Sequence, residues 1–229
     1  MIVETMTMEE VCSYVLKSVK ANMDRISALV YHKSKDYRRT ILKSKKVRHE
    51  FPPISFEADG LIYYICPSSN GKKEFKQYGV KMYVFVHFYY KGTNWYAQCL
   101  ENYTEIGLYC QHFFKRYIER HLKNDKPVTI GTVIQYLNET DSNVYCSHKE
   151  NPKHKNCMYG TTNIGMCCGY ITKNYCNVWL TYIDKETIEK GHKFEVYDRT
   201  KELVIPIGQD KDGKYVFPFS IEPRIVFSN

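Results

Sequence analysis

The residues in this chain that are best suited to chemistry stand close together, between positions 111 and 120. His112, Arg116, Glu119 and Arg120 occupy relative positions 0, 4, 7 and 8. At about 100° per residue, the four side chains would fall on one side of a helix, within an arc of about 100°. An imidazole can transfer a proton near neutral pH, and guanidinium groups hold phosphate oxygens in a forked geometry. The spacing predicts a site for a phosphate ester, or alternatively the wet side of an amphipathic helix in which Glu119 pairs with a neighbour.

A helix over residues 105–123 has to position this motif. Phe114, Ile118 and Leu122 recur every four residues on its opposite side, which gives the helix an apolar back. A second helix is expected over residues 129–137, where the apolar residues again share one face.

Strand patterns lie on both sides of these helices. Apolar runs separated by turn residues such as Asp59-Gly60 predict hairpins, whereas the polar residues 141–165 are expected to be irregular. The sequence therefore predicts an α+β fold: a mostly antiparallel sheet with one or two packed helices and a helical basic N-terminal segment. The expected strands cover residues 54–67, 79–90, 95–100, 164–173, 176–183, 194–207 and 215–227.

The N-terminal segment reads as helical. Apolar residues recur at steps of three and four over residues 8–30, and Thr7 with Glu10 forms a capping-box pattern. The Pro-Pro pair at residues 52–53 cannot continue a helix. We therefore expect a boundary there, with residues 1–50 as the basic helical segment and residues 51–229 as an antiparallel α+β core domain.

The net charge of +8 is concentrated in one block. Between residues 33 and 50, eight Lys or Arg residues face only Asp36 and Glu50. Such a run attracts nucleic acid, an anionic membrane or an acidic protein, or else it is simply a solvated helix. The block has few large apolar residues, which argues against a membrane-bound helix. The eight residues are Lys33, Lys35, Arg38, Arg39, Lys43, Lys45, Lys46 and Arg48.

The polar insertion also carries residue types that bind metal. Cys146, His148, His154 and Cys157 could supply the four ligands of a structural zinc ion, which would order a loop that lacks apolar residues. Their spacing differs from that of a standard zinc finger, and neighbouring lysines would oppose a dication. The alternative is a loop in which these residues are incidental.

The remaining patterns concern location and excluded chemistry. No apolar stretch is long enough to span a membrane, and the first 20 residues lack a signal peptide. We therefore expect a cytoplasmic protein whose nine cysteines are reduced thiols. The phosphate-binding, dinucleotide-binding and zinc-protease motifs are absent from the sequence, which leaves those activities without support.

Residues 80–190 resemble the BrnT-like and RelE-like toxin domains. In these families a helix with a His-Ala-x-x-Arg-x-x-x-Arg pattern precedes an antiparallel sheet. His112, Arg116, Glu119 and Arg120 fit this spacing, with phenylalanine in place of the usual alanine. The resemblance implies an RNA-cleaving or RNA-binding protein of a bacterial mobile element or phage.

The same resemblance implies a ribonuclease mechanism without a required cofactor. The 2′-hydroxyl would attack the adjacent phosphate, with His112 as general acid or base. Arg116 and Arg120 would clamp the phosphate, and Glu119 would orient an arginine or act as the base.

Three functions therefore remain open. A metal-independent ribonuclease requires the motif residues to meet in a cleft with a base from a second element. A non-catalytic protein that binds RNA, DNA or a protein partner requires an exposed basic face, and a structural interaction protein would use Arg116 and Arg120 on internal carboxylates. We expect no membrane partner.

Overall fold

The computed structural model describes residues 1–99, 106–140, 145–148, 157–174, 176–189, 208–209 and 215–216. The chain divides into two compact units, Met1–Lys190 and Gly191–Asn229. In the second unit, β11 (Gly208–Gln209) pairs antiparallel with β12 (Tyr215–Val216). All of the strand predicted at 194–207, and residues 217–227 of the strand predicted at 215–227, lie outside the described residues.

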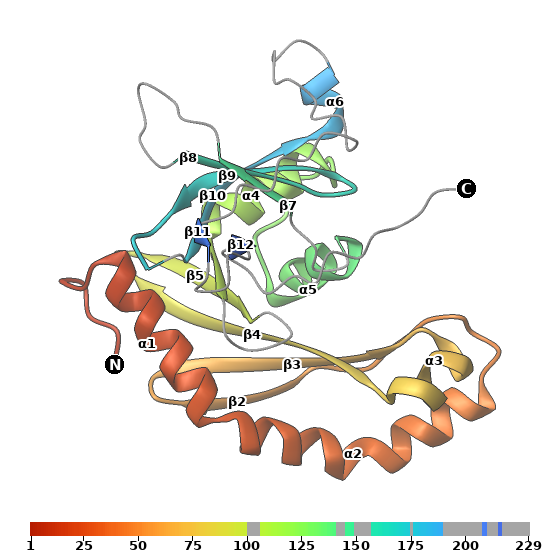
Figure 1. Cartoon of the computed structure of the whole chain (residues 1–229). Helices are drawn as coiled ribbons and strands as arrows, with labels where there is room; N and C mark the ends of the chain where they lie inside the picture. The colour runs from red at the N-terminus through yellow and green to blue at the C-terminus, as the bar shows by residue number, and fades with distance from the viewer. Residues whose placement is uncertain are drawn as a thin grey trace. The chain divides into compact units, whose positions relative to one another are not determined.

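A large sheet forms the frame of the first unit (Figure 1). The order is β1-β3-β4-β5-β6-β10-β9-β8-β7, with β2 beside β3. Among the described strands of this sheet the pairs are antiparallel, except that β6 and β10 run parallel. The predicted α+β class with a mostly antiparallel sheet is confirmed. The strands are β1 His49–Glu50, β2 Ile54–Ala58, β3 Leu61–Ser69, β4 Lys81–Tyr90, β5 Thr93–Cys99, β6 Ile106–Cys110, β7 Tyr145–His148, β8 Cys157–Thr161, β9 Gly165–Ile171 and β10 Asn177–Asp184.

Helices cover both faces of this sheet (Figure 1). Tyr63 on β3 points toward α1, where its hydroxyl lies 2.6 Å from that of Ser18. Tyr96 on β5 points to the opposite face, where its ring meets Phe114 of α4 edge-on at 5.1 Å. The assignment of faces follows from the register, because Tyr63 pairs with Val86 and successive strand residues alternate between faces. The helices are α1 Met8–Ala21, α2 Met23–Lys43, α3 Gly71–Tyr78, α4 Gln111–Arg120, α5 Ile130–Glu139 and α6 Lys185–Glu189.

Aromatic side chains fill the space between the sheet and α4–α5. Phe113 packs edge-on against Tyr109 at 5.0 Å and against Tyr136 at 5.1 Å, and Tyr117 meets Tyr182 at 5.6 Å. Burying such rings removes much apolar area from water. These tyrosines are therefore core side chains.

Several local signals in the sequence are confirmed. The Thr7 hydroxyl accepts from the Glu10 amide, and the Glu10 carboxylate accepts from the Thr7 amide at 2.7 Å, which closes the predicted capping box. Asp59 and Gly60 have φ values of 55° and 70°, as a tight hairpin turn requires. The helix expected over residues 8–30 is instead two helices that meet at Asn22.

Two predicted elements were wrong. Residues 106–110 form β6 rather than the start of a helix, and α4 begins only at Gln111. All five residues of β6 are buried, so their apolar run lacks the alternation that marks a half-buried strand. Residues 141–165 are not wholly irregular either, because they contain β7 and β8.

A disulfide joins Cys12 of α1 to Cys176, just before β10. The two Cα atoms lie 6.5 Å apart, although 164 positions separate the residues in the sequence. The prediction that all nine cysteines are reduced was therefore wrong for this pair. Burial raises the pKa of the Cys66 and Cys99 thiols to about 12, which keeps them protonated and unreactive.

No helix in the described parts of the chain is both long and apolar enough to cross a membrane.

We expect reduction of the Cys12–Cys176 bond to destabilise the first unit. A cross-link over a loop of this length stabilises by up to about 5 kcal/mol in the chain-entropy model. Urea unfolding with and without reductant should show a lower midpoint in reductant for the wild type. Cys168→Ser, which changes a cysteine outside the disulfide, should respond to reductant as the wild type does. An unchanged midpoint in the wild type would contradict the structural role of this bond.

Candidate functional site

The motif helix α4 is held by its apolar side. Phe113, Phe114, Tyr117 and Ile118 are buried, whereas the sequence pattern had assigned the apolar back to residues 114, 118 and 122. The additional buried rings broaden the face that packs against the sheet. His112, Arg116, Glu119 and Arg120 lie off this packed face, but only the first three are joined by hydrogen bonds, and Arg120 binds the sheet instead.

Arg116 is engaged along its own helix. Its Nη1 lies 2.8 Å from the Glu119 carboxylate, and its Nε donates to His112 Nε2 at 3.3 Å. Partial burial and the positive charge of Arg116 lower the pKa of His112, while Glu119 opposes this effect. His112 is therefore a neutral imidazole at neutral pH, and its Nε2 lone pair already accepts a hydrogen bond.

Arg120 is engaged with the sheet. Its Nη1 donates to the backbone carbonyl oxygen of Tyr182 on β10 at 2.6 Å. A hydrogen bond from a charged donor is stronger than one between neutral groups, so this contact fastens α4 to β10. The structural alternative had expected both arginines to bind internal carboxylates. Arg116 does so, while Arg120 binds a backbone carbonyl instead.

A carboxylate from a second helix does approach α4, but not at the predicted motif. Glu139 of α5 accepts from the Tyr117 hydroxyl at 2.5 Å and lies 3.2 Å from His121 Nε2. Gln135 donates to the same carboxylate at 2.8 Å. Burial, and then Glu139, raise the pKa of Tyr117, so the phenol keeps its proton and remains a donor. The sequence analysis missed this α4–α5 contact, for which the spacing of Tyr117 and His121 was the available signal.

The candidate zinc ligands fall largely outside the described residues. The backbones of Cys146 and His148 belong to β7 and that of Cys157 to β8, in a hairpin that pairs His148 with Met158. His154 and the side chains of all four candidate ligands lie outside the described part. The zinc site therefore stays a prediction. The side chains that the structure does describe contain no group of three metal-binding residues.

The basic block forms an exposed surface on α2 and the segment after it. Five of its cations lie on α2, which packs inward through buried residues such as Tyr37 and Ile41. Arg48 is held by Glu50 at 3.1 Å and by the Asn138 carbonyl, and Arg39 lies 3.7 Å from Asp36. The described residues supply no ion-pair partner for the other six. All eight are exposed: Lys33, Lys35, Arg38, Arg39, Lys43, Lys45, Lys46 and Arg48.

Helix α3 extends this surface. Gly71 at its start has φ +88°, and a Cβ there would lie 3.0 Å from the Val47 carbonyl oxygen. The start of α3 therefore lies directly against the segment that carries Lys45 and Lys46, and Figure 1 shows α3 beside the end of α2. We call these eleven exposed cations the basic face: the eight residues above with Lys72, Lys73 and Lys76. The last three could not be predicted to join this surface, because the pairing of β1 with β3 brings them close only in the folded chain.

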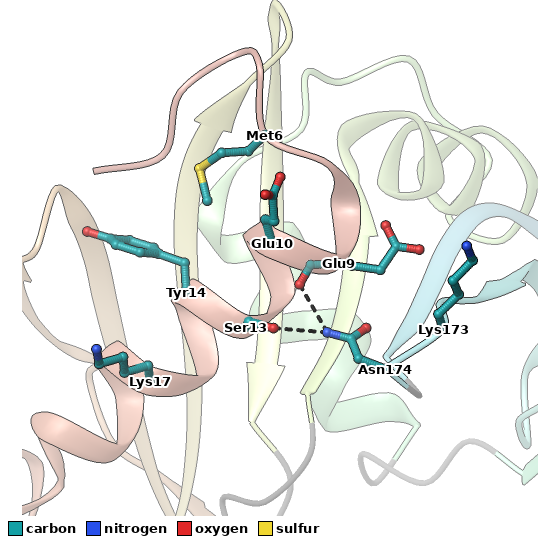
Figure 2. A pocket seen from close by; sticks show the side chains of 8 residues that line it. All are labelled: Met6, Glu9, Glu10, Ser13, Tyr14, Lys17, Lys173 and Asn174. Atoms are coloured by element: carbon teal, nitrogen blue, oxygen red, sulfur yellow. Dashed lines mark hydrogen bonds between the residues drawn. The ribbon is translucent and has the colours of Figure 1, made fainter.

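A shallow hollow beside α1 differs from the basic face in its charge (Figure 2). The amide of Asn174 donates to the Glu9 carbonyl and to the Ser13 hydroxyl, both at 3.0 Å. Lys17 and Lys173 line the hollow together with acidic side chains, so charges of both signs meet there. The hollow therefore offers exposed lysines in a setting unlike the basic face, and these serve as controls.

The Arg120 contact predicts a loss of stability in a variant. Arg120→Ala should lower the free energy of unfolding by about 1–2 kcal/mol, because it removes a charge-assisted hydrogen bond between α4 and β10. Lys115→Ala, on the same helix but largely exposed and 3.9 Å from Glu119, should change it by less than about 0.5 kcal/mol. Denaturant unfolding measures both. Equal effects would mean that Arg120 does not fasten the helix.

The environment of His112 predicts a pH dependence. Its pKa in the folded chain lies below the ordinary value of 6.5, so the unfolded chain binds protons first as the pH falls. The free energy of unfolding should therefore decrease as the pH falls through the ordinary value and on toward the folded pKa. An NMR titration of the imidazole should give the lowered pKa, and Arg116→Gln should raise it. A pKa at or above 6.5 in the wild type would contradict the geometry.

Comparison with protein-family models, curated proteins and solved structures finds no match to this chain. The likeness to BrnT-like and RelE-like domains therefore stays a prediction.

Proposed function

We propose that this protein binds nucleic acid through the phosphate backbone at the basic face, without cleaving it there. The proposal is supported by the exposed cations of the basic face. Along α2, α3 and the segment after α2, most cations are exposed and have no ion-pair partner among the described residues. Like charges held together on a folded surface repel one another, and a polyanion relieves that repulsion while it releases its own counterions.

The location of this face argues for binding rather than catalysis. α2 lies on the α1 side of the sheet, because Arg25 stacks over Phe56 at 4.2 Å and Phe56 stacks on Tyr63. α4 lies on the opposite side. A phosphate bound by α2 cations such as Arg38 therefore lies on the other side of the sheet from His112.

The metal-independent ribonuclease stays as the second proposal, for a separate site on α4. His112 is neutral and so has the protonation state that a general base requires. Arg116 and Arg120 would both have to leave their present acceptors in order to clamp a phosphate. Because that exchange has a cost, we place nucleic-acid binding first. A protein partner at the basic face is the remaining alternative.

The cytoplasmic location predicted from the sequence also stays a proposal. The Cys12–Cys176 disulfide favours an oxidising compartment, since cytosolic thiol buffers keep most such pairs reduced. The thiol state of these two cysteines in protein isolated directly from its cells would distinguish the two locations.

The binding proposal is tested with labelled RNA and DNA oligonucleotides over a range of salt concentrations. Lys35→Glu/Arg38→Glu should weaken binding about 10-fold or more and reduce the slope of log K against log salt by more than about 1. Lys17→Glu/Lys173→Glu makes the same change in net charge at the hollow of Figure 2 and should have little effect. Equal losses in the two variants would contradict a specific basic face.

Cleavage is measured in the same samples with a chelator present. We expect the wild type to bind RNA without cutting it. Cleavage by the wild type that disappears in His112→Ala/Arg116→Ala would overturn the order of the two proposals.

A further inference from the structure

One strip of α2 combines an aromatic ring with the cations. At about 100° per residue, Tyr31, Lys35, Arg38 and Leu42 fall within an arc of about 60°. This strip lies about 120° around the helix from the buried side that contains Ile41. Its four side chains are all exposed to solvent. The strip therefore runs from an aromatic ring through two cations to a leucine.

Tyr31 is far more exposed than most of the tyrosines whose side chains the structure describes. Its side chain is 76% exposed, whereas Tyr63, Tyr109 and Tyr136 are buried in the core. The ring contact recorded for it within the described residues is an edge contact with His32, at 6.4 Å between centroids. A ring with most of its surface in solvent can stack on a planar partner.

The chemistry of the strip fits an unpaired base next to phosphates. An exposed ring offers a stacking surface to any base. Lys35 and Arg38, at i+4 and i+7 from Tyr31, lie along the same side of the helix, where they can bind the phosphates of the nucleic acid. The bases of a duplex already stack on each other, so a duplex would gain from the cations but not from the ring. An acidic peptide would likewise use the charges and leave Tyr31 without a role.

We infer that the basic face takes single-stranded nucleic acid, with Tyr31 as the stacking platform for one base. This inference rests on the proposed function, because the cations of the basic face supply most of the affinity. Tyr31 adds preference for strands whose bases are unpaired. RNA and DNA share this chemistry, so both belong in the test.

The test compares binding of labelled oligothymidylate, oligouridylate and a duplex of the same length to the full chain. Tyr31→Ala should weaken binding of both single strands about 10-fold and leave duplex binding unchanged. Tyr31→Phe keeps the ring and should bind as the wild type does. Tyr89→Ala is the matched control, since Tyr89 is 63% exposed but lies on β4 rather than on α2.

The outcomes separate the inference from the function on which it rests. If Lys35→Glu/Arg38→Glu loses binding while Tyr31→Ala behaves like Tyr89→Ala, the stacking role is overturned and the proposed function stands. Equal binding of duplex and single strands by the wild type, or equal binding of polyglutamate, would also overturn the inference. If the charge-reversed variant binds normally, the proposed function itself fails.

Discussion

The parallel pairing of β6 with β10 is the contact on which the first unit depends. It joins one antiparallel set of strands, β1 to β6, to another, β7 to β10, and it places Trp179 opposite Tyr109. Parallel neighbours cannot be linked by a tight turn, so the chain between them must cross over. Helices α4 and α5 lie within that crossover and pack on the junction it creates.

Both faces of this junction are fastened by side chains distant in sequence. On one face the disulfide holds Cys12 of α1 to Cys176, which stands directly before β10. On the other, Arg120 of α4 donates to the Tyr182 carbonyl of β10. These contacts hold α4 in place and engage the Arg120 side chain, which a phosphate clamp would need. An arginine that fastens a strand leaves its acceptor unpaired if it turns toward a substrate, and buried acceptors are costly to leave unpaired.

The sequence was informative where the signal is local. The Thr7 capping box and the Asp59-Gly60 turn depend on neighbours a few residues apart, and the hairpins depend on alternation within one strand. The same reasoning failed at β6, because a strand buried on both faces shows no alternation. It also failed for Cys12 and Cys176, whose contact arises only when α1 crosses the sheet. The candidate site divides in the same way. The spacing of the motif residues on α4, and the pairing of Arg116 with Glu119, could be predicted from the sequence. The Tyr182 carbonyl that binds Arg120 could not, because it lies far away in the sequence.

The fold constrains only one side of α2 and leaves the residues of the basic face unconstrained by packing. α2 needs only its buried side, with residues such as Tyr37 and Ile41, to pack on the sheet. Its outward side could therefore carry any solvated residues at no cost to the fold, including acids that would pair the cations. Instead the cations cluster with few acids among them, and α3 adds three more. Such clustering opposes folding through self-repulsion, and a bound polyanion would relieve that repulsion. Helix α4 thus serves mainly to hold the sheet, whereas α2, on the opposite face, carries most of the basic-block cations that lack an ion-pair partner among the described residues.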